Sequence, residues 1–213
     1  MKILVTGFAP FGGEAINPSY EAVRQLPDAL GDAHIIKMEI PVAFGKDIDC
    51  IAAALEKYNP DAVVCVGQAG GRTQITPEFV GINYMNARIP DNDGNQPTGR
   101  IVEDGPDAYF STLPVFAMTE AAREAGIPAG VSYTAGTYCC NEVMYGLLHL
   151  LATKHTNARG GFIHVPYLST QPDALSGKAP SMPLSMMVEG LTAMIDALIK
   201  NPVDRAPVDG TEA

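Results

Sequence analysis

Short aliphatic runs alternate along this chain with longer segments whose apolar residues recur at helical spacing. Apolar, β-branched runs are typical of buried strands, and recurrence every three to four residues is typical of helices that cover a sheet. Strands are predicted at residues 2–7, 34–41, 61–67, 75–89 (with a bend or hairpin), 129–133 and 160–165. Helices are predicted near residues 44–57, 106–125, 140–154 and 183–199. This order of elements predicts an α/β protein, a three-layer α/β/α sandwich around a mixed, largely parallel and twisted sheet.

Local signals mark another helix start and the end of the folded part. Asn17 is a good N-cap, and Pro18 fits the first helical position, where its missing N–H is not needed. No internal repeat or linker divides residues 1–200, so we expect a single domain there. From Asn201 onward the chain becomes polar and proline-containing, which predicts a frayed tail over residues 201–213.

Composition and charge narrow the class of protein. Of the 213 residues, 46% are hydrophobic and 18% are charged, which is typical of a soluble globular protein. The formal net charge of −10 argues against nucleic acid or an anionic membrane as a partner. The N-terminus lacks the basic and cleavage regions of a signal peptide, and no apolar run approaches membrane-spanning length. We therefore expect a cytoplasmic protein whose cysteines stay reduced.

One segment suggests covalent chemistry. Residues 133–141 read Tyr-Thr-Ala-Gly-Thr-Tyr-Cys-Cys-Asn and deliver Cys140 to the start of an apolar, helix-patterned segment. A thiol there lies among unpaired backbone N–H groups at the positive end of the helix dipole, which favours the nucleophilic thiolate. The same N–H groups can receive an oxyanion. Alternatively, Cys140 is a small buried hydrophobe, the commonest fate of a free cysteine, and this segment alone leaves both interpretations open.

A histidine and a carboxylate elsewhere in the chain fit the first interpretation. His164 ends a short apolar run that Pro166 breaks, and strand ends are where α/β proteins present residues to a crevice. Glu78 is the one carboxylate in the mostly apolar run 75–83. A cysteine, a histidine and a carboxylate form the set that activates a thiol nucleophile, with the carboxylate orienting the imidazole.

Two further motifs resemble a nucleotide-binding loop and a zinc site, but neither has the required spacing. The loop at residues 7–13 follows a strand, but it lacks the lysine and the glycine spacing of nucleotide-binding loops. Cys139 and Cys140, even together with His149 and His155, lack the spacing of structural zinc sites. We therefore expect no nucleotide, no metal and no other cofactor.

A series of motifs, in order along the chain, resembles one known family. They are residues 1–8 (Met-Lys-Ile-Leu-Val-Thr-Gly-Phe), 10–13 (Pro-Phe-Gly-Gly), 16–19 (Ile-Asn-Pro-Ser), 66–72 (Val-Gly-Gln-Ala-Gly-Gly-Arg), 87–92 (Ala-Arg-Ile-Pro-Asp-Asn), 94–97 (Gly-Asn-Gln-Pro), the cysteine block, and 162–167 (Phe-Ile-His-Val-Pro-Tyr). From Met1 to about residue 200 the chain thus resembles pyrrolidone-carboxylate peptidases (pyroglutamyl peptidase I), a family of cysteine peptidases. The resemblance implies a triad of Cys140, His164 and Glu78.

The resemblance also implies a substrate and its pocket. Such an enzyme removes pyroglutamate from the N-terminus of peptides through a pyroglutamyl-thioester, and the family often forms homotetramers. Phe8 and Phe11 would sandwich the flat, neutral lactam, the backbone of Gln68 would meet it, and Arg88 would lie near the catalytic centre. From the residues alone, both phenylalanines could instead anchor a loop, and Arg88 could form a surface ion pair.

The chain departs from the family pattern at four positions. A basic residue is usual where Phe79 follows the glutamate, an acidic one at Ala9, an aliphatic one at Cys139, and alanine at Gly81. None of these changes removes a catalytic group, but they put turnover rate and substrate preference in question. Two other functions remain open: a catalytically silent small-molecule binding protein, and a cysteine amidase for other lactams or acyl groups.

Overall fold

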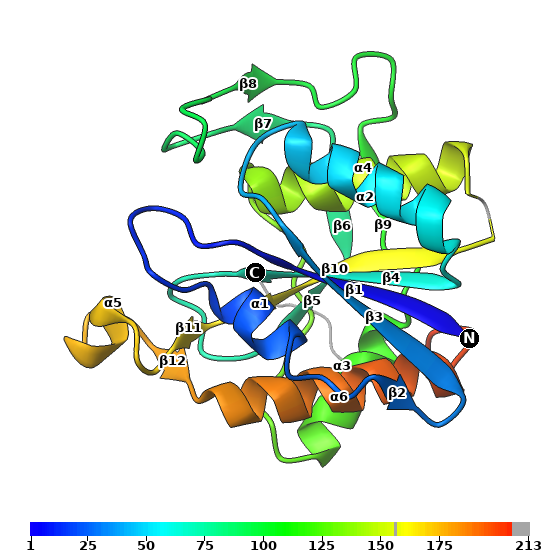
Figure 1. The fold of residues 1–213 in the computed structure, drawn as a ribbon, viewed down its shortest axis with the longest axis vertical. Coiled ribbons are helices and arrows are strands. Elements are labelled where there is room, and N and C mark those ends of the chain that lie inside the picture. The colour runs from blue at the N-terminus through cyan, green and yellow to red at the C-terminus, as the bar shows by residue number, and fades with distance from the viewer. Residues whose placement is uncertain (156, 206–213) are drawn as a thin grey trace.

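A six-stranded sheet lies at the centre of the protein, between two layers of helices (Figure 1). The computed structural model describes residues 1–155 and 157–205. The strands, in spatial order, are β2 (Ala29–Leu30), β3 (Ala33–Ile40), β1 (Lys2–Phe8), β4 (Ala62–Gln68), β10 (Arg159–Val165) and β5 (Thr76–Glu78). The three inner pairs are parallel, and the two edge pairs, β2 with β3 and β5 with β10, are antiparallel. The predicted sandwich with its mixed, largely parallel sheet is confirmed.

Helices cover both faces of the sheet (Figure 1). One face carries α1 (Pro18–Val23), α3 (Val115–Glu124) and α6 (Leu184–Lys200), and the other carries α2 (Lys46–Tyr58) and α4 (Cys139–Thr153). Successive residues of β4 alternate between the two apolar cores: Val64 and Val66 face one, Val63 and Cys65 the other. This alternation explains why the whole strand is apolar. Within the described ranges, no helix is long and apolar enough to cross a membrane.

The predicted first helix is confirmed at its start. Asn17 is the N-cap of α1, and its Oδ1 accepts a hydrogen bond from the backbone N–H of Ser19 at 3.1 Å. Pro18 occupies the first turn, as expected.

Short strand pairs and one short helix complete the fold. The pairs are β6 (Val80–Ile82) with β9 (Ala108–Phe110), β7 (Met85–Asn86) with β8 (Thr98–Gly99), and β11 (Tyr167–Leu168) with β12 (Ser181–Met182). The short helix is α5 (Pro172–Leu175). The run predicted as a bent strand over 75–89 is therefore three strands, β5, β6 and β7, each with a different partner.

One predicted strand and the start of one predicted helix are wrong. The segment 129–133 is not a strand, because it makes only isolated bridges, Ile75 with Ala129 and Glu78 with Ser132. The helix predicted from residue 106 begins only at Val115, because β9 pairs with β6 and Pro114 is the N-cap. Periodicity alone could not separate these cases, because pairing partners far along the chain decide them.

The first residues of the predicted tail contact the folded domain. The two carboxylate oxygens of Asp204 accept hydrogen bonds from the backbone N–H groups of Phe116 and Ala117, both at 3.1 Å. Asp204 thereby satisfies two N–H groups at the start of α3 that have no partner within the helix. Residues 206–213 of that tail lie outside the described residues.

Candidate active site

The start of α4 is held in place by a buried asparagine. Asn141 donates from Nδ2 to the carbonyls of Ile82 (2.8 Å) and Tyr84 (2.9 Å), and its Oδ1 accepts from the N–H of Ile82 at 3.0 Å. These bonds fix the first turn of the helix against β6. The N–H groups of Cys139 and Cys140, in that turn, have no carbonyl to donate to within the helix.

The Cys140 thiol lies directly over the strand next to the one that carries His164. A Cβ atom added at Gly67 of β4 would lie 3.0 Å from Cys140 Sγ and 2.7 Å from the ring of Phe162. Gly67 pairs in register with His164 of β10. Only a residue without a side chain leaves room for the thiol to approach this point of the sheet.

His164 and Glu78 form a buried pair. Their side chains are 4% and 0% exposed, and 2.7 Å separates His164 Nδ1 from Glu78 Oε1. The antiparallel pairing of β5 with β10 sets Glu78 opposite Phe162, two residues before the histidine, so the two side chains meet diagonally. An ionised carboxylate can only accept, so Nδ1 carries the proton and the other ring nitrogen, Nε2, remains available as a base.

Arg72 is a third partner of this pair, and sequence reasoning gave it no role. Its Nη1 lies 2.6 Å from the same Glu78 oxygen that His164 contacts, and it also donates to Thr76. Its Nη2 donates to the carbonyl of Thr134, in the loop that precedes α4, at 3.1 Å. A lone carboxylate in an apolar run implies a buried cation, and Arg72 is the basic residue closest to Glu78 along the chain. That signal could have identified it.

Burial makes the resting site neutral. Burial, and then the charge of Glu78, raise the pKa of Cys140, while Arg72 and the cysteine's own N–H act in the opposite direction. These shifts oppose the thiolate that the helix terminus alone favours. Burial also lowers the pKa of His164, although Glu78 opposes this change. The resting pair is a thiol and a neutral imidazole.

A small, mostly apolar cavity of about 50 Å³ opens beside the thiol. Its lining residues are Phe8, Phe11, Asn17, Val42, Gln68, Tyr138, Cys139 and Cys140. The structure thus brings three of the four predicted substrate-binding residues, Phe8, Phe11 and Gln68, together with Cys140. Phe8 is buried and packs on Phe162, with ring centroids 6.3 Å apart, while Phe11 is half-buried.

The fourth predicted substrate-binding residue, Arg88, does not line this cavity. Its side chain is exposed and, within the described ranges, forms no hydrogen bond or ion pair with the triad. The loop that carries it is nevertheless attached to the segment before Cys140, because the N–H of Asn86 donates to the Thr137 carbonyl at 2.9 Å. The Tyr138 hydroxyl donates to the Pro90 carbonyl at 3.0 Å.

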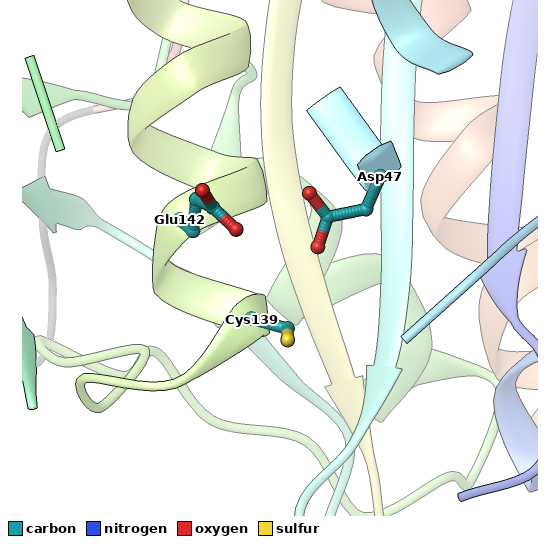
Figure 2. A group of neighbouring side chains, drawn as sticks. All are labelled: Asp47, Cys139 and Glu142. Carbon is teal, nitrogen blue, oxygen red and sulfur yellow. The ribbon is translucent and has the colours of Figure 1, made fainter. Parts of the chain in front are cut away.

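A second group of chemically active side chains lies beside the same helix start. Asp47, Cys139 and Glu142 are all buried and point toward one another (Figure 2). They share no residue with the Cys140–His164–Glu78 group.

Comparison with known proteins gives a consistent result over the whole chain. A family model described as pyroglutamyl peptidase matches residues 1–201. The chain is 50% identical over 212 residues to the pyrrolidone-carboxylate peptidase of Enterococcus faecalis, covering 99% of both chains. It is also 50% identical over 211 residues to that of Clostridium perfringens, again covering 99% of both.

Solved structures agree with the sequence comparison. The structure of pyroglutamyl peptidase I from Bacillus amyloliquefaciens matches with a TM-score of 0.92 and 45% identity, covering 97% of this chain and 98% of that one. A mutant pyrrolidone carboxyl peptidase from Pyrococcus furiosus matches with a TM-score of 0.89 and 42% identity, covering 94% and 99%.

Proposed function

The chain belongs to the pyroglutamyl peptidase family, and we propose that Cys140, His164 and Glu78 carry its activity. It is a cysteine peptidase that hydrolyses the bond after an N-terminal pyroglutamyl residue. The observation that carries the residue assignment is the 2.7 Å contact between His164 Nδ1 and Glu78 Oε1. His164 lies on β10, which pairs with β4, the strand next to the Cys140 thiol.

Catalysis begins from the neutral pair. As Cys140 Sγ attacks the carbonyl carbon that follows the lactam ring, its proton passes to His164 Nε2. Glu78, held at Nδ1, stabilises the imidazolium that forms. The imidazolium then protonates the leaving amine, which leaves a pyroglutamyl-thioester on Cys140. Water, deprotonated by His164, hydrolyses this thioester and restores the thiol.

The first turn of α4 serves the tetrahedral intermediates. The backbone N–H groups of Cys139 and Cys140 lie at the positive end of the helix and can donate to the oxyanion. The anchoring of Asn141 keeps these donors fixed before the substrate arrives.

Arg72 acts in this proposal as a positioning residue. It touches neither the substrate nor the reacting atoms, but it shares the Glu78 oxygen with His164 and reaches the loop before α4 through Thr134. Its positive charge lies next to the buried Glu78 carboxylate as a countercharge.

In this proposal the cavity accepts a flat, neutral ring and excludes a charged N-terminus. We place the lactam between Phe8 and Phe11, against the backbone of Gln68. The Gln68 side chain is held separately, because its Oε1 accepts from Gln171 Nε2 at 3.0 Å. None of the lining residues is acidic, so an α-ammonium group entering this cavity would be buried without a countercharge. Arg88 does not line this cavity, and it stays a candidate for supporting charge near the catalytic centre.

The experiment compares hydrolysis of pyroglutamyl-, glutaminyl- and prolyl-amides carrying the same fluorogenic leaving group. We expect the pyroglutamyl compound to be cleaved at least about 10²-fold more efficiently than the glutaminyl one. Truncating Phe8 or Phe11 to alanine should lower kcat/KM by a factor that corresponds to about 1–3 kcal/mol of lost transition-state stabilisation. Iodoacetamide should still alkylate Cys140 at a near-normal rate.

Three outcomes would overturn parts of this proposal. Comparable cleavage of the glutaminyl compound would indicate a broader cysteine aminopeptidase. Binding of free pyroglutamate without turnover of any amide would indicate a silent binding protein. Faster hydrolysis of free lactams or of other acyl amides would indicate the amidase.

We further propose that the chain forms a homo-oligomer, as a tetramer. An aromatic cluster of Phe79, Phe110, Phe116 and Tyr133 supports this, because Phe110 is 65% exposed at its edge. Phe79, where the family usually has a basic residue, lies at its centre. Light scattering coupled to size exclusion should report four subunits for the wild type and fewer for Phe110→Glu.

Residues 1–200 form, in our proposal, one peptidase domain that works in the cytoplasm on N-terminally pyroglutamylated peptides. The free state of all four cysteines supports a reducing compartment, which a thiol nucleophile requires. Fractionation of the source cells, with activity assayed in each fraction, tests the location.

A further inference from the structure

We propose that Asp47, Cys139 and Glu142 form a binding site for a thiophilic divalent cation, with Zn²⁺ as the preferred ion. One ligand atom from each residue, the Cys139 sulfur and one oxygen of each carboxylate, lies within 4.8 Å of the other two. Figure 2 shows the three side chains converging between α2 and α4. Zn²⁺ accepts thiolate and carboxylate ligands together, and three protein ligands leave a fourth position for water.

Each carboxylate is already oriented for this role. The N–H of Ile48 donates to Asp47 Oδ1 at 2.7 Å, and the N–H of Gly45 donates to Glu142 Oε1 at 3.1 Å. The second oxygens, Asp47 Oδ2 and Glu142 Oε2, are buried and have no hydrogen-bond partner in the described structure. An oxygen on each carboxylate without a donor calls for a positive or donating group between them. Without metal, the proton that burial keeps on this pair fills that place, and a divalent cation can displace it.

The charges around this site favour the binding of a cation. Within the described ranges, neither Asp47 nor Glu142 forms an ion pair with a basic side chain, and neighbouring Lys46 pairs instead with Asp93 at 2.6 Å. The charges of Asp49 and Asp91 add to the negative potential at Glu142. A doubly charged ion is therefore electrostatically favoured here.

The fold can also accept the charge of the loaded site. Two carboxylates, a thiolate and Zn²⁺ sum to one net negative charge. The site lies where the N-termini of two helices meet, since Asp47 is in the first turn of α2 and Glu142 is in the first turn of α4. Both helix dipoles present their positive ends to that residual charge.

The geometry requires only a small contraction. Zn–O and Zn–S bonds of about 2.0–2.3 Å place tetrahedral ligand atoms about 3.3–3.7 Å apart. Side-chain rotations that move the ligand atoms by about 1 Å are therefore enough. Cys139 also lines the substrate cavity, which gives the ion a route to the site. This donor set differs from the cysteine–histidine set that the sequence argued against, and it depends on residues 92 positions apart (139 minus 47).

The test removes the catalytic thiol first, because Cys140 and His164 could themselves bind zinc. Metal-stripped Cys140→Ala protein is titrated with Zn²⁺, and we expect one ion per chain and a rise in Tm. In this background, Asp47→Asn, Glu142→Gln and Cys139→Val should each weaken binding by at least about tenfold, as even supporting residues of metal sites do. His164→Ala should leave binding unchanged.

Cobalt provides an independent readout of the sulfur ligand. Co²⁺ added to the Cys140→Ala protein should give a cobalt–thiolate charge-transfer band, which Cys139→Val should abolish. Asp47→Asn and Glu142→Gln are neutral and keep the side-chain shape, so Tm without metal should stay close to that of the parent. If one variant fails to fold, the other two still each remove one ligand.

Two results would overturn the proposal. One is the absence of stoichiometric Zn²⁺ binding to the Cys140→Ala protein. The other is binding that His164→Ala abolishes but the three ligand substitutions leave intact. None of these measurements uses peptidase activity, so their outcome is independent of the proposed catalytic mechanism.

Discussion

Two buried sites that contain carboxylates lie near the start of α4, and they differ in the side chains that pair with those carboxylates. Glu78 meets Arg72 and His164, each within 2.7 Å of the same oxygen. Asp47 and Glu142 meet each other, and no basic side chain pairs with them among the described residues. Both groups are removed from water, so burial alone does not distinguish them.

The partners decide the ionisation. Burial, together with the charge of Glu142, raises the pKa of Asp47 to about 9, and burial also raises the pKa of Glu142. At neutral pH and without a metal, this pair therefore retains a proton. Glu78 has Arg72 as a countercharge and can stabilise an imidazolium, which a protonated carboxyl cannot do. In our proposals the Glu78 group therefore serves catalysis, whereas the Asp47 group exchanges its retained proton for a cation.

The largest expected effect separates the two adjacent cysteines. Cys140→Ser should lower kcat/KM by at least about 10³-fold, because a hydroxyl is far less acidic than a thiol in the same place. Cys139→Val should keep most of the activity, since Cys139 packs in the apolar core beside α4. Both are measured with a pyroglutamyl-amide substrate. An active Cys140→Ser protein together with an inactive Cys139→Val protein would reverse the assignment.

The next largest effect compares the same chemical change in the two carboxylate groups. Glu78→Gln should lower kcat by about 10²-fold because the imidazolium loses its countercharge, and His164→Ala should cost more, since the base itself is lost. Asp47→Asn should change kcat by less than about threefold, because it replaces a group that is already neutral. Steady-state kinetics with a chelator present measures all three.

A matched histidine serves as the control for that series. His155 pairs with Glu56 at 3.3 Å, away from the thiol. His155→Ala should leave kcat near that of the wild type. A loss as large as that of His164→Ala, in a folded protein, would require a different triad.

Arg72 should produce a smaller effect with a characteristic pH signature. Arg72 lowers the pKa of both His164 and Cys140, so Arg72→Met should raise both. The acidic limb of kcat/KM, where His164 must be neutral to act as base, should then move to higher pH, with about a tenfold loss near pH 7. Arg72→Lys should return the acidic limb to its wild-type pH, because lysine restores the positive charge. A uniform loss at every pH would indicate a merely structural role.

The smallest effect concerns stability. From pH about 4 to about 9 the folded protein keeps a proton on the Asp47–Glu142 pair that the unfolded chain has released, so stability should fall as pH rises through this window. The slope from this site is at most about 1.4 kcal/mol per pH unit. Asp47→Asn should remove it. Denaturant unfolding at two pH values, with chelator present, checks this, and equal slopes for both proteins would contradict the raised pKa.

Local sequence determined a large part of this protein. The runs predicted at 2–7 and 61–67 became central strands because residues 3–7 and 62–67 are all buried, on one face of the sheet or the other. Asn17 and Pro18 set a helix start through contacts within a few residues. Cys140, ahead of an apolar periodic segment, could be placed at a helix N-terminus for the same reason.

The tertiary structure alone decided how these parts meet. The bent run 75–89 became three strands because its partners, β10, β9 and β8, lie elsewhere along the chain. The pKa of Cys140 rises because burial and Glu78 outweigh the local helix terminus. The contact of Asp47 with Glu142 follows from how segments distant in sequence pack, since the ionisation of a buried group depends on its neighbours in space.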